Sequence, residues 1–209
     1  MNPPSLSTLG AGFSDLALGS QAVFRAALHA LSHPGRIVDV PHDAQLPAHG
    51  HGASAALLLA LLDPDGGLWL SPSMRDTDAS AWLRFHTGCV LVEHPSQAQF
   101  AWIAQGDECP ALDEFAQGSA AYPDQSTTCV LDVAALTAQG PAAWRLRGPG
   151  IRDHIALQVE GLPGLNSGAF TDQWQANQAA FPRGVDVFLA TARHIVGLPR
   201  TTRIEPRED

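Results

Sequence analysis

Hydrophobic residues recur at helical spacing between residues 14 and 31, and this pattern predicts the first helix of the chain. The side chains expected to face the core are those of Leu16, Val23, Phe24, Ala27, Leu28 and Leu31. Pro34 and Gly35 follow and predict the end of the helix, because proline cannot continue a helix and glycine is favoured just beyond one. A second helix is expected at residues 53–62, where a nearly unbroken apolar run is typical of a helix buried on most sides.

Short apolar runs between turn-forming residues predict a series of strands. They lie at residues 36–40, 68–70, 89–93, 99–104, 127–133, 143–147, 185–190 and 195–198. Further helices are expected from a cap at Asp76 or Thr77 to Phe85, at residues 111–116, and at residues 171–180, where Phe181-Pro182 ends the helix. Helices interleaved with short strands predict a layered α/β fold with a mixed sheet.

The 209 residues, of which 45% are apolar, are enough for one sizeable core, and no Pro/Gly-rich or charged linker divides them. We therefore expect a single domain at residues 13–204, with loose ends at residues 1–12 and 205–209. Cys89, Cys109 and Cys129 are an odd set with wide spacing, which fits neither a disulfide framework nor a paired-cysteine metal site. Reduced thiols in the core are the expected state.

The formal net charge of −9 opposes binding to nucleic acid, because that affinity depends mainly on cations against backbone phosphates. All 12 formal cations are arginines and the chain contains no lysine. This excludes a lysine Schiff base and any phosphate loop that depends on a lysine. The longest apolar stretch is too short to span a bilayer and no signal-peptide pattern begins the chain. We expect a cytoplasmic protein without nucleic-acid or membrane contacts.

Three motifs resemble functional sites, but each has a simpler structural interpretation. His49 and His51, with His42 nearby, offer imidazoles to a metal, yet no third ligand stands at a recognisable spacing. A polar surface loop, without metal, is therefore the expectation. Gly148-Pro149-Gly150 follows a strand as a phosphate cradle would, but no lysine or hydroxyl completes it. We expect a Pro-Gly turn with a positive φ at Gly150.

The residue types of a hydrolytic triad occur together in the first quarter of the chain. They are Ser32, His29, His33 and Asp39. The serine lies at a helix end before His-Pro-Gly, and no Gly-x-Ser-x-Gly motif occurs in the sequence. A cap or turn role is expected, and we assign no catalytic residue. The five tryptophans are scattered over separate elements, so they are expected to be core or interface anchors.

Arginines and neighbouring hydroxyls are the remaining candidates for ligand binding or assembly. Arg200, Thr201 and Thr202 place a guanidinium beside two hydroxyls, which suits bidentate binding of a phosphate or carboxylate. An arginine near a strand end also commonly pairs with an acidic residue such as Asp186. A structural or subunit-contact role therefore ranks ahead of ligand binding.

Arg25, Arg84 and His86 complete this group of candidates. Arg84 and His86 are expected at the C-terminal end of a helix, where the helix dipole favours cations. The same preference for structure or subunit contact applies to them.

The two ends of the chain carry the most distinctive sequence blocks. They are residues 24–35 (FRAALHALSHPG), 181–187 (FPRGVDV) and 198–202 (LPRTT), with 83–87 (LRFHT) and 146–151 (LRGPGI) between them in the expected order. Together they resemble the PhnH family, the H subunit of the bacterial carbon-phosphorus lyase core complex. Within these blocks, the residues expected to have a structural role are Pro34, Gly35, Gly148, Gly150, Pro182, Gly184, Asp186 and Pro199.

This resemblance implies a three-layer α/β fold similar to that of PLP-dependent transferases, but without the cofactor, which agrees with the missing lysine. It also implies a homodimer that works with sister subunits G, I and J and with the L subunit. Their combined reaction converts ATP and an alkylphosphonate into ribose 1-alkylphosphonate 5-triphosphate and adenine. The family has no catalytic motif in this subunit that can be carried over, so an accessory role is expected.

Two other function classes stay open at this stage. One is a stand-alone enzyme or ligand-binding protein that acts on a phosphorylated small molecule through Arg25, Arg84 and Arg200. The other is a scaffold that binds no ligand. The lack of a recognisable nucleophile, metal set or nucleotide loop favours the accessory subunit and the scaffold over the enzyme.

Overall fold

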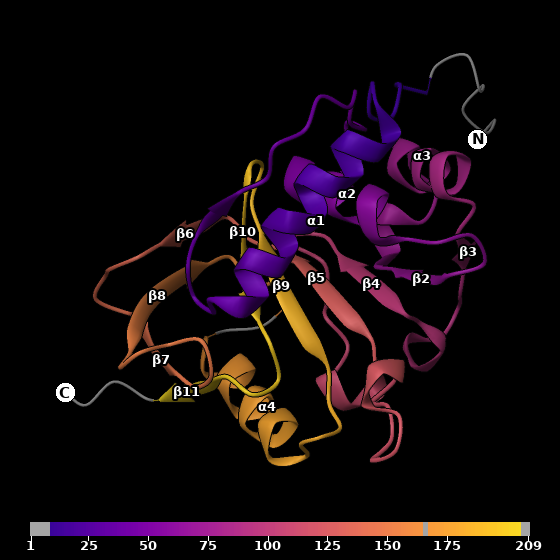
Figure 1. Ribbon diagram of the computed structural model, residues 1–209. Helices are drawn as coiled ribbons and strands as arrows, with labels where there is room; N and C mark the ends of the chain where they lie inside the picture. The colour runs from indigo at the N-terminus through magenta and orange to yellow at the C-terminus, as the bar shows by residue number, and fades with distance from the viewer. Residues whose placement is uncertain (1–8, 165–166, 206–209) are drawn as a thin grey trace.

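The computed structural model describes residues 9–164 and 167–205, and its centre is a seven-stranded sheet of order β1-β10-β9-β5-β4-β2-β3 (Figure 1). The strands are β1 (Val38–Asp39), β2 (Gly67–Leu70), β3 (Val90–Leu91), β4 (Phe100–Ile103), β5 (Thr128–Asp132), β9 (Asp186–Ala190) and β10 (His194–Leu198). Neighbouring strands from β3 to β9 are parallel, whereas β10 is antiparallel to both β9 and β1. The predicted mixed α/β architecture is therefore confirmed.

Three helices cover one face of this sheet: α1 (Leu16–Ser32), α2 (Gly52–Leu61) and α3 (Asp78–Thr87) (Figure 1). Asp15 caps α1 by accepting a 3.0 Å hydrogen bond from the backbone N–H of Leu18. Residues 53–59 of α2 are all buried, as its uniform apolarity predicted. In this layer Leu58, Trp82 and Phe188 belong to one continuous apolar cluster between the helices and the sheet.

The buried face of α1 differs from the predicted one. Val23, Ala26, Ala27 and Ala30 are buried, whereas Leu16 is 67% exposed, Phe24 46% and Leu28 51%. The buried stripe consists mainly of alanines because α1 packs very closely on β10, where no space exists for larger side chains. Periodicity alone favoured the larger residues, and that part of the expectation was wrong.

A second sheet, of order β11-β7-β8-β6, and one helix lie on the opposite side of the molecule. The elements are β6 (Ala135–Thr137), β7 (Trp144–Arg147), β8 (Ile155–Glu160), β11 (Arg203–Glu205) and α4 (Ser167–Ala179). Trp144, Phe170 and Trp174 stack with ring centroids 5.2 and 6.0 Å apart and join this layer to the second apolar cluster. The sequence patterns had not predicted β6, β8 or β11.

The structure also tests several predictions about short segments and single residues. Residues 111–116 form only a short 3₁₀ turn, Leu112–Glu114, instead of a helix. Gly150 has a φ of +83°, which confirms the predicted turn. The three cysteines are free thiols. Among the described residues, no helix is long and apolar enough to cross a membrane.

All five tryptophans are core residues of this single chain. Trp69, Trp82, Trp102, Trp144 and Trp174 are each 6% exposed or less. Of the two roles expected for them, core anchor or interface anchor, the structure shows the core role. Part of the expected loose N-terminal end is also fixed, because the carbonyl of Gly10 accepts hydrogen bonds from Trp82 and His86. Residues 1–8 and 206–209 lie outside the described residues.

Candidate functional site

Polar residues gather at the carboxyl edge of the parallel strands. In open α/β sheets this edge is the usual place for ligand sites, above all where successive connections leave on opposite faces. Here β2 lies between β3 and β4, so the order of connections changes between β2 and β4. Ser71 follows β2, and Asp132 ends β5, which lies on the other side of β4.

Asp132 is the centre of this edge and is almost completely buried, with 1% of its surface exposed. Its Oδ1 accepts hydrogen bonds from Ser54 Oγ at 2.5 Å and from Trp102 Nε1 at 3.0 Å. Its Oδ2 accepts one from the backbone N–H of His51 at 2.9 Å. Three elements, the start of α2, β4 and β5, therefore meet at one carboxylate.

Burial raises the pKa of Asp132 above its ordinary value, because desolvation disfavours the charged form. The hydrogen bonds from Ser54 and Trp102, and the nearby His51, act in the opposite direction without cancelling this effect. The carboxyl also lies at the N-terminal end of α2, where the helix dipole stabilises negative charge. The arrangement fixes the start of α2 to the end of β5.

The loop before α2 brings His51 into this site. Its Nε2 donates a 3.1 Å hydrogen bond to the carbonyl of Val133, which fixes the orientation of the ring. His51 is half-buried, so for this residue the expectation of a simple surface loop was wrong. Gly50 has a φ of +77°, and a Cβ atom there would lie 2.2 Å from the Trp102 ring. Only glycine lets the loop approach so closely.

Two further carboxylates flank the site. Asp107 accepts hydrogen bonds from the N–H and Oγ of Ser73 at 3.0 and 2.7 Å. Partial burial of Asp107 would raise its pKa, but hydrogen bonds from Ser71 and Ser73 outweigh burial and lower the pKa below the usual value. Asp78 holds His49 through a 2.6 Å contact between Oδ1 and Nδ1.

This edge offers pairs of potential metal ligands but no complete metal site. Within residues 9–164 and 167–205, no three His, Cys, Asp or Glu side chains come close enough to hold an ion. A cavity of about 290 Å³ opens beside Arg75 at the ends of β2 and β3. Arg75 already donates from Nε to the carbonyl of Leu70, and Asp76 and Glu93 also line the cavity. Two carboxylates beside one guanidinium make this cavity a poor anion site.

Arg200, one of the candidates from the sequence, lies at the opposite edge of the sheet and has all of its donors engaged. Nε and Nη2 form a bidentate pair with Asp186 at 3.1 and 2.6 Å. Nη1 donates to the carbonyls of Pro123 and Pro182, and Nη2 also to Ser126 Oγ. The five N–H groups of a guanidinium are thus satisfied inside the chain. The pairing with Asp186 that the sequence suggested is present.

The other candidates are not assembled into one site. Arg25 and Arg84 are exposed on α1 and α3, and His86 donates a 2.9 Å hydrogen bond from Nε2 to the carbonyl of Gly10. Thr201 is half-buried, and the hydroxyl of Thr202 is buried without a hydrogen-bond partner among the described residues. The guanidinium and two hydroxyls at residues 200–202 therefore do not face solvent together.

The glycines and prolines of the sequence blocks shape the backbone. Pro34 is buried, Gly35 (φ +80°) donates to the carbonyl of Gly197, and Gly148 (φ +142°) lies against Thr201. Gly184 (φ +121°) lies against Asn177, whose side chain bonds both backbone groups of Val185. Pro182 and Pro199 line a shallow pocket at the same edge as Arg200. These positions have a structural role.

The sequence reasoning missed Asp132 and Ser54 as functional candidates. The only signal was a single carboxylate at the end of an apolar strand, Thr128–Asp132. Nothing in the sequence links it to Ser54, which lies 78 positions earlier. The contact exists only because α2 packs over the end of β5.

Comparison with known proteins places the chain in a family. The model of the bacterial phosphonate metabolism protein family (PhnH) matches residues 11–205. A relative from Rhizobium meliloti (strain 1021), named alpha-D-ribose 1-methylphosphonate 5-triphosphate synthase subunit PhnH, is 39% identical over 193 residues, 92% of this chain and 94% of the relative. A protein of Stutzerimonas stutzeri, named as C-P lyase subunit protein HtxG, is 33% identical over 190 residues, 88% of this chain and 85% of the relative. The chain therefore belongs to the PhnH family of bacterial phosphonate metabolism proteins.

Proposed function

We propose that this chain is an accessory subunit of the carbon-phosphorus lyase core complex. In this role it is required for conversion of ATP and an alkylphosphonate into ribose 1-alkylphosphonate 5-triphosphate and adenine. The observation that carries the proposal is the match over nearly the whole of a relative that is named as a subunit of the corresponding synthase. A subunit, by definition, works with other chains, and the expected partners are the G, I, J and L subunits.

The geometry of the chain agrees with a non-catalytic role. A stand-alone enzyme would use Arg25, Arg84 and Arg200 together. They lie on α1, on α3 and in the turn after β10, and they share no hydrogen-bond partner among the described residues. Asp132 is held by three donors and is nearly inaccessible. The described residues unite no nucleophile, base and free phosphate site, which catalysis would require.

Further properties of the chain also belong to this proposal. We expect the fold to resemble that of PLP-dependent transferases, because the helices and the second sheet cover opposite faces of the large mixed sheet. We also expect a protein without PLP, since no lysine amine exists to form an aldimine. No other cofactor is proposed, and the expected location is the cytoplasm.

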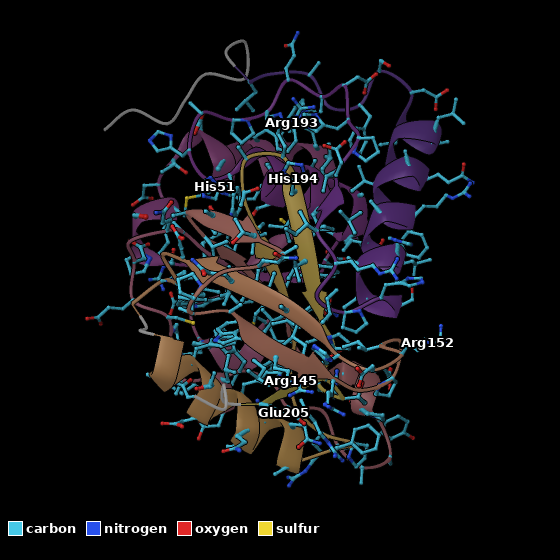
Figure 2. All side chains as sticks on the ribbon, turned by 90° about the vertical axis from the view of Figure 1, so that its left-hand side faces the viewer. His51, Arg145, Arg152, Arg193, His194 and Glu205 are labelled. Carbon is cyan, nitrogen blue, oxygen red and sulfur yellow. The ribbon has the colours of Figure 1, made fainter. Side chains whose placement is uncertain are left out.

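A homodimer is also part of the proposal, and α1 offers a surface for it. Ala17, Gln21, Phe24, Leu28 and Leu31 follow the 4-3-4-3 spacing of a helix–helix seam. Phe24 and Leu28 are half-exposed on this seam, and α1 lies at the front of the molecule in Figure 1 and at its outer edge in Figure 2. Light scattering should give twice 22.1 kDa. Phe24→Glu with Leu28→Glu should shift it to one chain, whereas Leu18→Glu, on another side of α1, should not.

Adenine release tests the accessory role. The purified chain should release no adenine from ATP and methylphosphonate, and release should appear when the G, I and L subunits are supplied. Omission of this chain from the complete mixture should lower the rate at least tenfold. A mixture that is fully active without this chain would refute the accessory role. Release by this chain alone, lost in an Arg84→Ala variant, would instead identify an enzyme.

A further inference from the structure

Four arginines gather on the outer face of the second sheet. Arg145 and Arg147 on β7, and Arg203 on β11, alternate with buried Trp144, Leu146 and Ile204, so their side chains project away from the core. Arg152 precedes β8. Figure 2 looks onto this side of the molecule and shows Arg145 beside Glu205, with Arg152 at the edge. We call Arg145, Arg147, Arg152 and Arg203 the arginine face.

The carboxylates on this face do not balance the arginines. Arg147 donates from Nε to Glu205 Oε2 at 3.1 Å, and its Nη2 lies 3.7 Å from Asp153 Oδ1. Arg145 Nε lies 3.7 Å from the same oxygen of Glu205, too far for a hydrogen bond. That Nε is buried and has no hydrogen-bond partner among the described residues. Glu205 and Asp153 therefore face four guanidinium groups, and Arg145 has no hydrogen bond to either carboxylate.

The register of the strands adds to this imbalance. Arg203 lies directly opposite Arg147 in the antiparallel pair of β11 and β7. Like charges at directly opposed positions destabilise a sheet. A local excess of positive charge attracts anions, even in a chain whose net charge is −9.

An open cavity of about 440 Å³ lies beside Arg145. It is lined by Arg145, His154, Ala156 and the loop at residues 139–143. Ala156 is the cross-strand partner of Arg145, and its small side chain leaves space next to the guanidinium. The volume lies within the range of about 300–1,000 Å³ that small-molecule sites occupy. The position is thus both electropositive and large enough for a ligand.

We propose that this cavity binds the triphosphate group of a nucleotide or of a ribose triphosphate, with Arg145 as the principal contact. The ligand class rests on the proposed function, because the relative named as a synthase subunit belongs to a reaction that yields a 5-triphosphate. A guanidinium presents paired donors that match two phosphate oxygens. The Arg145 side chain is 38% exposed, and its two Nη groups form no hydrogen bond within the described residues, whereas its buried Nε is out of reach of a ligand. Arg152 and Arg203, which form no ion pair within the described residues, add long-range attraction.

Calorimetric titration of the full chain with inorganic triphosphate, ATP and adenosine tests the proposal. Inorganic triphosphate and ATP should bind with similar affinity, and adenosine should not bind. Arg145→Gln should weaken the binding of both at least about tenfold, the loss expected for one charge-assisted contact. Arg193→Gln is the matched control, because it removes the same charge from a side chain that is 79% exposed and distant in Figure 2.

A second variant tests the cavity without a change of charge. Ala156→Leu should block binding of triphosphate, while its thermal unfolding stays close to that of the parent chain. Absence of triphosphate binding by the parent chain would overturn the proposal. Equal weakening of triphosphate binding by Arg145→Gln and Arg193→Gln would mean that the chain attracts triphosphate non-specifically. That result would also overturn the proposal.

These outcomes are separate from the test of the proposed function. A chain that supports adenine release but binds no triphosphate would refute only the site beside Arg145. A chain that binds triphosphate at this site but is dispensable for adenine release would refute only the accessory role.

Discussion

Gly197 of β10 lies directly against Ala30 of α1, and a Cβ atom at position 197 would come within 2.6 Å of the Ala30 carbonyl carbon. This contact sets the distance between the first helix and the sheet. It requires a stripe of small residues on α1, and for that reason Phe24 and Leu28 point outward. The outward face then becomes available to a partner.

Gly197→Ala should destabilise the chain by about 1–3 kcal/mol, because the added Cβ would meet backbone atoms of α1 and one element must move. Urea unfolding followed by circular dichroism measures the free energy. Gly106→Ala is the control for backbone strain, since Gly106 has a φ of +92° and an added Cβ there would meet no atom within 4 Å. It should cost about 1–2 kcal/mol through the left-handed conformation alone. A stable Gly197→Ala chain with unchanged dimerisation would contradict this account of α1.

Arg200→Ala should reduce the free energy of unfolding by about 3 kcal/mol. The substitution leaves Asp186, which is 25% exposed, without its bidentate partner and removes donors from two carbonyls. Arg183→Ala, at an exposed arginine nearby, should change stability by less than about 0.5 kcal/mol. Chemical denaturation distinguishes the two. Equal, small effects would mean that the Arg200 network is not structural. Arg207, an arginine of the C-terminal tail that could serve as a second control, lies outside the described residues.

Asp132 should make the stability of the chain depend on pH in an unusual direction. Burial raises the pKa of Asp132 in the folded chain above its unfolded value, so between the two values the folded state binds more protons. This carboxyl therefore loses stabilising effect as the pH rises from its ordinary value of 3.8 through the folded value. The unfolding free energy of the parent chain minus that of Asp132→Asn should grow as the pH falls, by at most about 1.4 kcal/mol per pH unit. A difference that shrinks at low pH would contradict the raised pKa.

Ser54→Ala provides a second measure of the same site. The substitution removes the 2.5 Å hydrogen bond to Asp132 and leaves one lone pair of a buried carboxylate unpaired. A loss of about 1–3 kcal/mol is expected. Ser14→Ala, at an exposed serine that donates to Asp43, is the control and should cost less. Comparable losses at both serines would show that burial of Asp132 adds nothing.

Incubation with PLP should leave no stable aldimine on the chain. An internal aldimine requires a lysine amine, and the chain has none, so only the N-terminal amine is available. After removal of excess PLP, the absorbance spectrum should show no retained aldimine band. Borohydride reduction followed by peptide mapping gives the stricter test. A label fixed inside the chain, away from the N-terminus, would contradict the prediction.

The order of most elements follows from local sequence patterns, because strand and helix periods differ and the turn residues Pro34, Gly35 and Gly150 have local conformational effects. The absence of lysine chemistry also follows directly from the sequence. The strand β8 could also have been predicted from the sequence, since Ile155, Leu157 and Val159 alternate with less apolar residues.

Which residues meet in space depends on the packing of distant segments. Asp132 and Ser54 are 78 positions apart, and no local pattern links a strand end to a helix start. The exposure of Phe24 depends on Gly197, which is far along the chain in another element. The imbalance at Arg145 depends on the register that places Glu205 and Arg203 on the next strand. Local sequence fixes the conformation of a segment, whereas burial, charge balance and free surface depend on packing between distant segments.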